Sequence, residues 1–338
     1  ISKFSHIFKN GLLIDQDFSK PQAFHKLPVT RSGGIACILS MSVFYYFFYL
    51  LYSKILYDYI FLSWAMFLVG FLDDLKINIK PLVRLFLMIC LITFITNYLP
   101  IKILNIDIPF LNFLLKNKIF SSFFILLCFL FIINGSNLID GFHGLLTLNL
   151  LIINLILVFV NINNENIEFS IILISQVIVL LSFLLFNFPK AKIFMGDGGA
   201  YVMGSLIALN TIITNNLNPN ISSFFFCTIL FYLFFEVFFS FLRKVIQKKS
   251  PIHPDSAHLH MLLYKYLNNF KKIENANPKT SLIINFIFII LIIPPTILNS
   301  NSTFCVYWFI FQIIFYVIIY SRLSNFLKEL DKDLALKE

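Results

Sequence analysis

Charged residues are scarce in this sequence of 338 residues. Asp, Glu, Lys and Arg make up 13% of the chain, whereas soluble domains carry about 25%. Apolar residues make up 59%, and no segment has the composition of an ordinary soluble domain. The shortage of charge therefore predicts an all-α, polytopic integral membrane protein, with the lipid bilayer as a partner.

Metal-binding cysteine spacings are also lacking. The five cysteines lie within or beside apolar runs and form no close pairs, so we interpret them as small core hydrophobes. Glycine is scarce while Phe, Ile, Asn and Lys are abundant, a bias typical of an AT-rich genome that hints at a bacterial source. No signal peptide is visible, and no internal repeat of the kind common in transporters.

Long apolar runs predict the fold. A helix needs about 17–20 apolar residues to cross a bilayer, and ten runs approach or exceed this length, at about 35–53, 59–72, 82–99, 119–133, 144–160, 168–187, 200–214, 221–242, 281–298 and 303–321. Residues 103–115 are expected to form a short amphipathic hairpin at the surface. We predict a single membrane domain, 1–338, with about ten transmembrane helices.

Lys and Arg fall mostly in alternate loops. When residues 1–34 are taken as cytoplasmic, the loops on that side hold 22 of the 26 Lys and Arg residues, and the opposite loops hold 4. Positive charge concentrates in the cytoplasmic loops of membrane proteins, so the net charge of +9 needs no nucleic-acid partner. This predicts a bacterial cytoplasmic-membrane protein whose polar motifs all lie on the cytoplasmic face.

The stretch 134–144 is a conspicuous polar interruption of the apolar sequence. Asn134, Asn137 and Asp140 recur every three residues, so on a helix they would share one broad face. An Asp in the middle of a bilayer costs roughly 2.5–3.5 kcal/mol, so such residues usually lie at a membrane edge or in a wet cavity and carry function. Glycines beside Asp140 allow the backbone to pass close to a ligand. The stretch therefore predicts a binding site.

Two acidic motifs adjoin spans on the same predicted face. Asp73 and Asp74 end the second span, and adjacent carboxylates repel each other unless a cation such as Mg²⁺ is present. Asp197 lies among glycines directly before a span, where free N–H groups at a helix start attract phosphate. The plainer alternatives are an interfacial acidic cap for the pair and an N-cap role for Asp197. Basic residues that could attract phosphate follow the pair: Lys76, Lys80 and Arg84.

Histidines gather in the longest predicted cytoplasmic loop, 243–280. Asp255 or Ser256 is expected to cap a short interfacial helix with an apolar stripe of Leu259, Leu262, Leu263 and Tyr266. His258 and His260 would lie at its N-terminal end, suited to contact with a diphosphate. On a helix these two rings would point in different directions, which disfavours zinc. An unspecialised basic surface loop is the alternative.

A further basic segment precedes the first span. His25, Lys26 and Arg31 stand before a Gly33-Gly34 pair. They could bind an anion, although cations that snorkel at a membrane interface give the same pattern. This segment is less specific than the others.

Together these motifs resemble those of the polyprenyl-phosphate N-acetylhexosamine-1-phosphate transferases, a family that includes the phospho-MurNAc-pentapeptide transferases of peptidoglycan synthesis. The resemblance covers nearly the whole chain and rests on the ordered set His25…Gly33-Gly34, Phe71-Leu-Asp73-Asp74, Asn134…Asn137…Asp140-Gly141, Asn187…Phe194-Met-Gly-Asp197 and His258-Leu-His260. Antigen-type members resemble eleven-span proteins, so an eleventh span is expected ahead of Ile1.

The resemblance implies an enzyme. Undecaprenyl phosphate would take N-acetylhexosamine 1-phosphate from a UDP-sugar, giving polyprenyl-diphosphate-sugar and UMP, at the start of cell-surface polysaccharide or O-antigen synthesis. Mg²⁺, with Mn²⁺ as the alternative, would be held by Asp73, Asp74 and Asp197. These three residues, with His258 and His260 at the diphosphate or sugar, are the predicted catalytic group. The predicted substrate-binding residues are Lys26, Asn134, Asn137, Asp140, His143, Asn187 and Phe194, with Phe194 stacked on uracil.

Three departures separate this chain from the family pattern. His143 replaces the second Asp of Asp-Gly-x-Asp-Gly, Gln22-Ala-Phe replaces a basic run before His25, and Met261 follows His260. The His-Leu-His pattern resembles the antigen-type branch. A pentapeptide transferase, a transporter or lipid flippase, and a relative that binds without reacting are the alternatives. The UDP-sugar and the oligomeric state stay open, with a homodimer among the alternatives.

Overall fold

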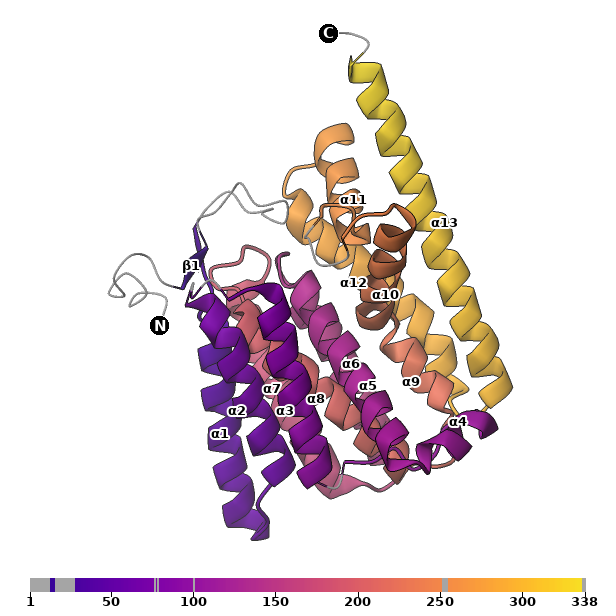
Figure 1. The fold of residues 1–338 in the computed structure, drawn as a ribbon. Helices are drawn as coiled ribbons and strands as arrows, with labels where there is room; N and C mark the ends of the chain where they lie inside the picture. The colour runs from indigo at the N-terminus through magenta and orange to yellow at the C-terminus, as the bar shows by residue number, and fades with distance from the viewer. Residues whose placement is uncertain are drawn as a thin grey trace.

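The structure, a computed structural model, describes residues 13–15, 28–75, 77, 79–99, 101–250 and 255–335. It is almost entirely helical, which confirms the all-α membrane class (Figure 1). A short antiparallel strand pair, β1 (Ile14–Asp15) and β2 (Val29–Thr30), lies before the first helix. The helices are α1 (Gly33–Tyr52), α2 (Tyr57–Asp74), α3 (Pro81–Tyr98), α4 (Pro109–Leu115), α5 (Lys118–Ile139), α6 (Leu145–Asn163), α7 (Ile167–Asn187), α8 (Gly196–Leu217), α9 (Ser223–Ile229), α10 (Phe231–Ile246), α11 (Leu259–Lys265), the π-helical turn η3 (Tyr266–Phe270), α12 (Ala276–Ile297) and α13 (Ser302–Ala335).

Each of the ten predicted apolar runs falls on a helix or, for 221–242, on the α9–α10 pair. Within the described residues, seven helices are long and apolar enough to cross a membrane, or eight if α9 and α10 form one bent span. The helices α2 and α8 do not meet this measure. α2 carries Asp58, Asp73 and Asp74, and α8 carries several Asn and Thr residues. The lengths of the two apolar runs had predicted spans here, but polar side chains make both helices less hydrophobic than the candidate spans.

Helix α8 is the axis around which the other helices pack. Of its 22 residues 17 are buried, and it contacts α1, α2, α5 and α6. Its most extensive packing is with α2, where a Cβ on Gly70 would lie 2.5 Å from the backbone of Asp197. A helix enclosed by other helices has little surface facing lipid, so small and polar residues are accepted along it.

Three connections differ from the sequence prediction. Residues 101–108 are irregular and lead into α4, because Pro109 suits the first turn of a helix; the expected hairpin over 103–115 was wrong. The α9–α10 pair bends by 76°. The loop expected over 243–280 is shorter, since α10 continues through Ile246 and α12 begins at Ala276.

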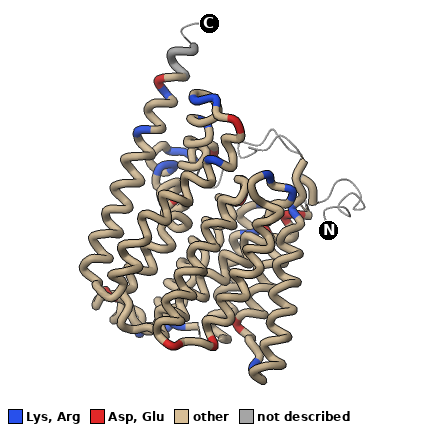
Figure 2. Tube along the Cα trace, turned by 180° about the vertical axis from the view of Figure 1, so that it is seen from behind, with Lys and Arg blue, Asp and Glu red and all other residues tan. Residues whose placement is uncertain are grey.

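Basic residues gather at one end of the molecule. Figure 2 shows most Lys and Arg segments near α11 and the C-terminal part of α13, with few at the opposite end. The same end holds the C-terminal ends of α2, α5 and α7 and the N-terminal ends of α1, α6 and α8. Alternating helices thus bring segments that are distant in sequence to one polar face.

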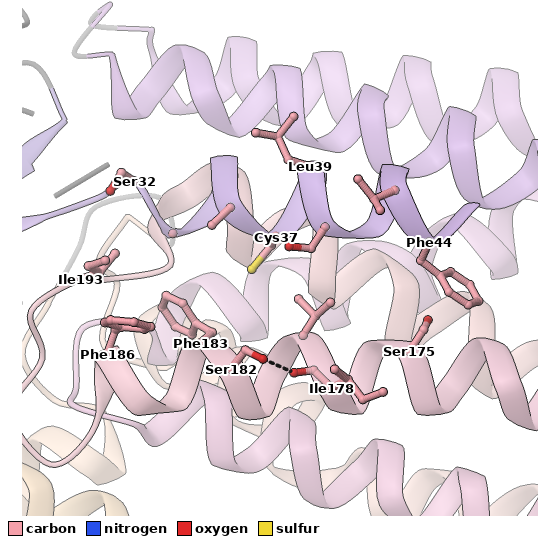
Figure 3. Close-up of a pocket in the computed structure, with 15 residues that line it drawn as sticks. Ser32, Cys37, Leu39, Phe44, Ser175, Ile178, Ser182, Phe183, Phe186 and Ile193 are labelled. Atoms are coloured by element: carbon pink, nitrogen blue, oxygen red, sulfur yellow. Dashed lines mark hydrogen bonds between the residues drawn. The ribbon is translucent and has the colours of Figure 1, made fainter. Parts of the chain in front are cut away.

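A groove of about 750 Å³ lies between α1 and α7, two of the candidate membrane spans (Figure 3). Small side chains line much of it, including Ala36, Cys37 and Ser182, and Phe183 and Phe186 lie toward one end. The hydroxyl of Ser182 donates to the carbonyl of Ile178 in its own helix. The groove is therefore an apolar surface that suits lipid chains.

We predict that Gly70→Ala separates α2 from α8 and lowers the unfolding temperature. The added methyl group cannot fit 2.5 Å from backbone atoms of α8, and overpacking of this kind costs about 1–3 kcal/mol. Thermal unfolding in detergent measures the effect. Leu68→Phe adds bulk on the exposed side of the same helix and should leave the unfolding temperature unchanged; equal effects of both variants would contradict the prediction.

Candidate functional site

The N-terminus of α8 is the centre of the candidate site. Asp74, the last residue of α2, accepts hydrogen bonds from the backbone N–H of Asp197 at 3.0 Å and of Gly198 at 2.9 Å. These bonds satisfy two of the four free N–H groups at the helix start, and the negative charge interacts favourably with the helix dipole. Asp74 therefore caps α8. The alternative in which the Asp197 side chain is the cap was wrong, and that side chain faces other groups.

Two arginines join the carboxylates. Nη1 of Arg84 lies 2.8 Å from Oδ2 of Asp73 and 2.8 Å from Oδ2 of Asp197. Nη1 of Arg31 lies 3.7 Å from Oδ1 of Asp197 and 3.9 Å from Oδ1 of Asp74. Three carboxylates from α2 and α8 thus converge with two guanidinium groups, and the structure brings the predicted acidic motifs together.

The end of α5 adds Asn137 and Asp140 to this cluster. Asp140 accepts a hydrogen bond from the N–H of Gly196 at 2.9 Å, where a φ of 73° favours glycine. Burial raises the pKa of Asp140 well above its usual range. Asn137 interacts with the side chain of Asp197, whereas Asn134 donates to a carbonyl one turn earlier in its own helix. Two of the three predicted residues therefore reach the site.

Asn187 fastens three segments beside the cluster. Its Oδ1 accepts from the N–H of Gly144 at 2.9 Å and from the hydroxyl of Thr147 at 3.0 Å, and its Nδ2 donates to the carbonyl of Ile193 at 2.9 Å. The side chain is 2% exposed. Both the oxygen and the nitrogen of the amide are hydrogen-bonded within the protein, so the structure gives Asn187 a structural role. Its contact with a nucleotide stays a prediction.

His143 and Phe194 lie near each other, with ring centroids 6.1 Å apart. Nδ1 of His143 is 3.1 Å from the carbonyl oxygen of Pro189, and the backbone N–H of His143 donates to Asn277 at 2.8 Å. Because a carbonyl oxygen only accepts, this contact assigns the proton of the neutral ring to Nδ1. Phe194 is 3% exposed. Its stacking on uracil stays a prediction.

His258 and His260 belong to a separate group around Glu236 of α10. Nδ1 of His258 is 3.0 Å from Oε1 of Glu236, and Nδ1 of His260 is 3.2 Å from the hydroxyl of Tyr232. The two rings stack 5.6 Å apart at 9°. The expectation that they point in different directions was wrong, because His258 is the extended residue before α11 and His260 lies on the helix. Both side chains are buried, and their contact with the diphosphate or sugar stays a prediction.

The start of α11 also differs from the prediction. Oε1 of Glu236 accepts from the N–H of Leu259 at 3.1 Å. Asp255 instead contacts Arg243 at 2.9 Å, so the expected capping by Asp255 or Ser256 was wrong. The buried residues of α11 are His260, Met261 and Leu262, of which Leu262 alone belongs to the predicted stripe.

Among the described residues, no three His, Cys, Asp or Glu side chains are arranged to hold a metal ion. Asp74 directs both carboxylate oxygens to backbone N–H groups. Asp73 and Asp197 remain as two carboxylates that meet at Arg84. Mg²⁺ is usually held by one or two carboxylates together with substrate phosphates. This pair therefore fits an ion that is completed by a diphosphate.

Some site residues were not predicted as such. Arg31 and Arg84 were interpreted only as cations that could attract phosphate, because sequence spacing does not reveal their carboxylate partners. Glu236 was missed, although it is the single acidic residue in the apolar run 221–242, which is itself a signal of function. Lys26 and His25 lie outside the described residues, and their roles stay predictions.

Comparison with known proteins supports the predicted family. Residues 56–215 match glycosyl transferase family 4. A phospho-N-acetylmuramoyl-pentapeptide-transferase of Dictyoglomus thermophilum is 32% identical over 248 residues, which cover 68% of this chain and 74% of that protein. The chain belongs to glycosyl transferase family 4. The family match includes the acidic cluster and ends before α9, so it leaves out Glu236 and the two buried histidines.

Two further relatives come from both branches of the family. An undecaprenyl-phosphate alpha-N-acetylglucosaminyl 1-phosphate transferase of Thermotoga maritima is 28% identical over 148 residues, which cover 44% of this chain and 45% of that protein. A phospho-N-acetylmuramoyl-pentapeptide-transferase of Clostridium perfringens is 33% identical over 153 residues, which cover 43% of this chain and 48% of that protein. The chain thus spans a little under half the length of these two relatives.

We predict that His260 makes stability depend on pH. Burial lowers the pKa of His260 from 6.5 to about 3, so below pH 6.5 the unfolded chain binds a proton that the folded chain excludes. Stability should therefore fall as the pH drops from 6.5, by up to about 1.4 kcal/mol per pH unit. Thermal unfolding between pH 7.5 and 5 measures this dependence. His260→Asn should flatten it, and parallel curves for the two proteins would contradict the assignment.

Proposed function

We propose that this protein is a sugar-1-phosphate transferase that acts on a membrane lipid. An oxygen of undecaprenyl phosphate forms a bond to the sugar-bearing phosphorus of a UDP-N-acetylhexosamine. The bond from that phosphorus to the UMP oxygen breaks, and UMP leaves with the electron pair. The observation that carries the proposal is the convergence of Asp73 and Asp197 beside the start of α8, in a chain of glycosyl transferase family 4.

The acidic pair suits metal binding better than proton removal. A phosphate monoester has a second pKa of about 6, so the attacking phosphate is largely ionised at neutral pH and needs little help from a base. When bound, Mg²⁺ would neutralise charge on the diphosphate as UMP departs. Asp73 and Asp197 would hold this ion, with Mn²⁺ as the alternative. Asp74 keeps the α8 start in place through its two hydrogen bonds.

The arginines suit the phosphates. Arg84 and Arg31 lie against the carboxylates, and guanidinium groups bind phosphate oxygens in the same planar geometry as carboxylate oxygens. Entry of a metal and a diphosphate would let both arginines exchange a carboxylate for a phosphate. Phe194 and His143 would then face the nucleotide, with Lys26 close to the nucleoside.

The membrane setting suits a lipid acceptor. An apolar cleft of about 420 Å³ lies between α5, α8 and the bent α9–α10 pair. It is lined by Phe131, Ala208 and Phe234 among other residues, and Ala208 stands eleven residues after Asp197, or about 16 Å along α8 at 1.5 Å per residue. A long isoprenoid chain can bridge this distance. The concentration of Lys and Arg at the site end favours a cytoplasmic face, where UDP-sugars are made.

A phospho-MurNAc-pentapeptide donor is the second candidate. The similarity to the Dictyoglomus relative, which covers 74% of that protein, favours it, and the His-Leu-His pattern favours the antigen-type branch. Membranes with Mg²⁺, undecaprenyl phosphate and a panel of labelled UDP-N-acetylhexosamines, including the pentapeptide donor, test both. The expected result is a labelled lipid and an equal amount of UMP. No lipid product from any donor would refute the proposed function.

We predict that Asp197→Asn lowers turnover by at least about 100-fold, the scale of losing one preorganised charge at a reacting phosphate. Asp73→Asn should raise the Mg²⁺ concentration needed for half-maximal rate. Both are measured in membranes after chelation and titration with Mg²⁺, at matched protein level. Asp58→Asn changes the same residue type at the opposite end of α2 and serves as the control. A near-normal rate in Asp197→Asn would contradict its metal role.

A further inference from the structure

Glu236 is a buried carboxylate that the acidic cluster does not use. It is 1% exposed and lies on α10, in an otherwise apolar run. Burying a charge costs several kcal/mol unless hydrogen bonds compensate. Three donors supply them: Nδ1 of His258 at 3.0 Å, the N–H of Leu259 at 3.1 Å and the hydroxyl of Tyr316 at 2.7 Å. One side chain thus joins α10, the start of α11 and α13.

The two oxygens of Glu236 have different tasks. Oε1 receives both the His258 ring and the first N–H of α11, whereas Oε2 receives Tyr316. The ring of His258 and the helix that follows it are therefore oriented by the same atom. Tyr316 holds the carboxylate through Oε2 alone and takes no part in the contacts at Oε1.

The second nitrogen of His258 has a weaker partner. Nε2 lies 3.4 Å from Oδ1 of Asp255, which is longer than an ordinary hydrogen bond. Asp255 is itself held by Arg243 at 2.9 Å, and its side chain is 29% exposed. An anion that enters from solvent could therefore replace Asp255 at Nε2, while Glu236 keeps Nδ1.

The histidine group also contacts the polar stretch at the end of α5. The ring of Phe142 meets the ring of His260 edge-on at 5.1 Å, and Phe142 stands between Asp140 and His143 in the sequence. His260 stacks in turn on His258. A shift of His258 would therefore reach the segment that carries Asp140.

We propose that Glu236 is a positioning residue for the transfer reaction. This inference rests on the proposed function. It holds Nδ1 of His258 and the first turn of α11, so that Nε2 of His258 is directed to the donor diphosphate in place of Asp255. A carboxylate behind an imidazole fixes the ring orientation, and an anion at each ring nitrogen is bound by the doubly protonated ring, in which both nitrogens donate. Glu236 does not touch substrate and acts only through His258.

A double-mutant cycle of Glu236→Gln and His258→Gln tests this dependence. Gln at position 236 keeps the shape and an oxygen for the N–H of Leu259 but loses the charge that holds His258. We expect kcat to fall about 10-fold to 100-fold, with KM for undecaprenyl phosphate within about 3-fold. In the His258→Gln background the same substitution should have no further effect. Losses that multiply would overturn the proposal, because Glu236 would then act without His258.

Tyr316→Phe is the matched control, since it removes one hydrogen bond to Oε2 and leaves Oε1 untouched. Its effect on kcat should be under about 3-fold, because the charge of Glu236 and the contacts at Oε1 remain. If Glu236→Gln does not accumulate in membranes, Glu236→Asp takes its place in the cycle, because it keeps the charge and shortens the reach. A loss of kcat in Tyr316→Phe as large as that in Glu236→Gln would contradict the separate tasks of the two oxygens.

A measurement without substrate separates this inference from the proposed function. Diethyl pyrocarbonate modifies accessible imidazoles, and peptide mass analysis reports each histidine separately. His258 should react at least about 10-fold faster in Glu236→Gln than in the unmodified sequence or Tyr316→Phe, relative to His143 as the internal reference. An unchanged rate would overturn the positioning role. If the rate rises but no UDP-sugar is turned over, the positioning of His258 stands and the proposed function fails.

Discussion

The two hydrogen bonds from the start of α8 to Asp74 are the contact on which the rest of the site depends. A helix that begins inside a bundle has backbone N–H groups that water cannot reach, and these groups must find acceptors. Asp74 supplies two of them from the end of α2, and Gly70 one turn earlier lets the two backbones approach. Once the start of α8 is fixed in this way, the Asp197 side chain is free to turn toward Asp73 and Arg84.

The same constraint explains the polar stretch at the end of α5. The N–H of Gly196 also needs an acceptor, and Asp140 provides it. Asn187 then connects the beginning of α6 to the segment that precedes Gly196. Residues that were predicted to contact a ligand therefore also accept or donate hydrogen bonds that backbone groups at the site need. Their polarity serves the fold at the site as well as any chemistry there.

Much of the fold follows from the sequence, because hydrophobic length dictates helices in a membrane. Each predicted run lies on a helix, and Asp73, Asp74, Asp140 and Asp197 meet as their positions on alternating spans required. The side-chain contacts did not follow from the sequence in the same way. The stacking of His258 on His260 depends on the extended backbone of a helix N-cap, and no periodicity reveals such a bend. The 103–115 segment shows the same limit, since Pro109 begins a helix where we expected a hairpin.

The balance of charge at the start of α8 determines which ligands the cluster can accept. Asp73, Asp74 and Asp197 face two guanidinium groups, those of Arg31 and Arg84. Asp140 adds a fourth carboxyl group, and burial raises its pKa well above the usual range. Carboxyl groups therefore outnumber guanidinium groups in the cluster, and an incoming diphosphate would add further negative charge. Like charges this close repel strongly in a partly buried site. A divalent cation held by Asp73 and Asp197 would offset this excess of carboxyl groups and release Arg84 toward the phosphates. The contacts of Arg84 with these two carboxylates are therefore the ones that a metal-bound diphosphate would replace.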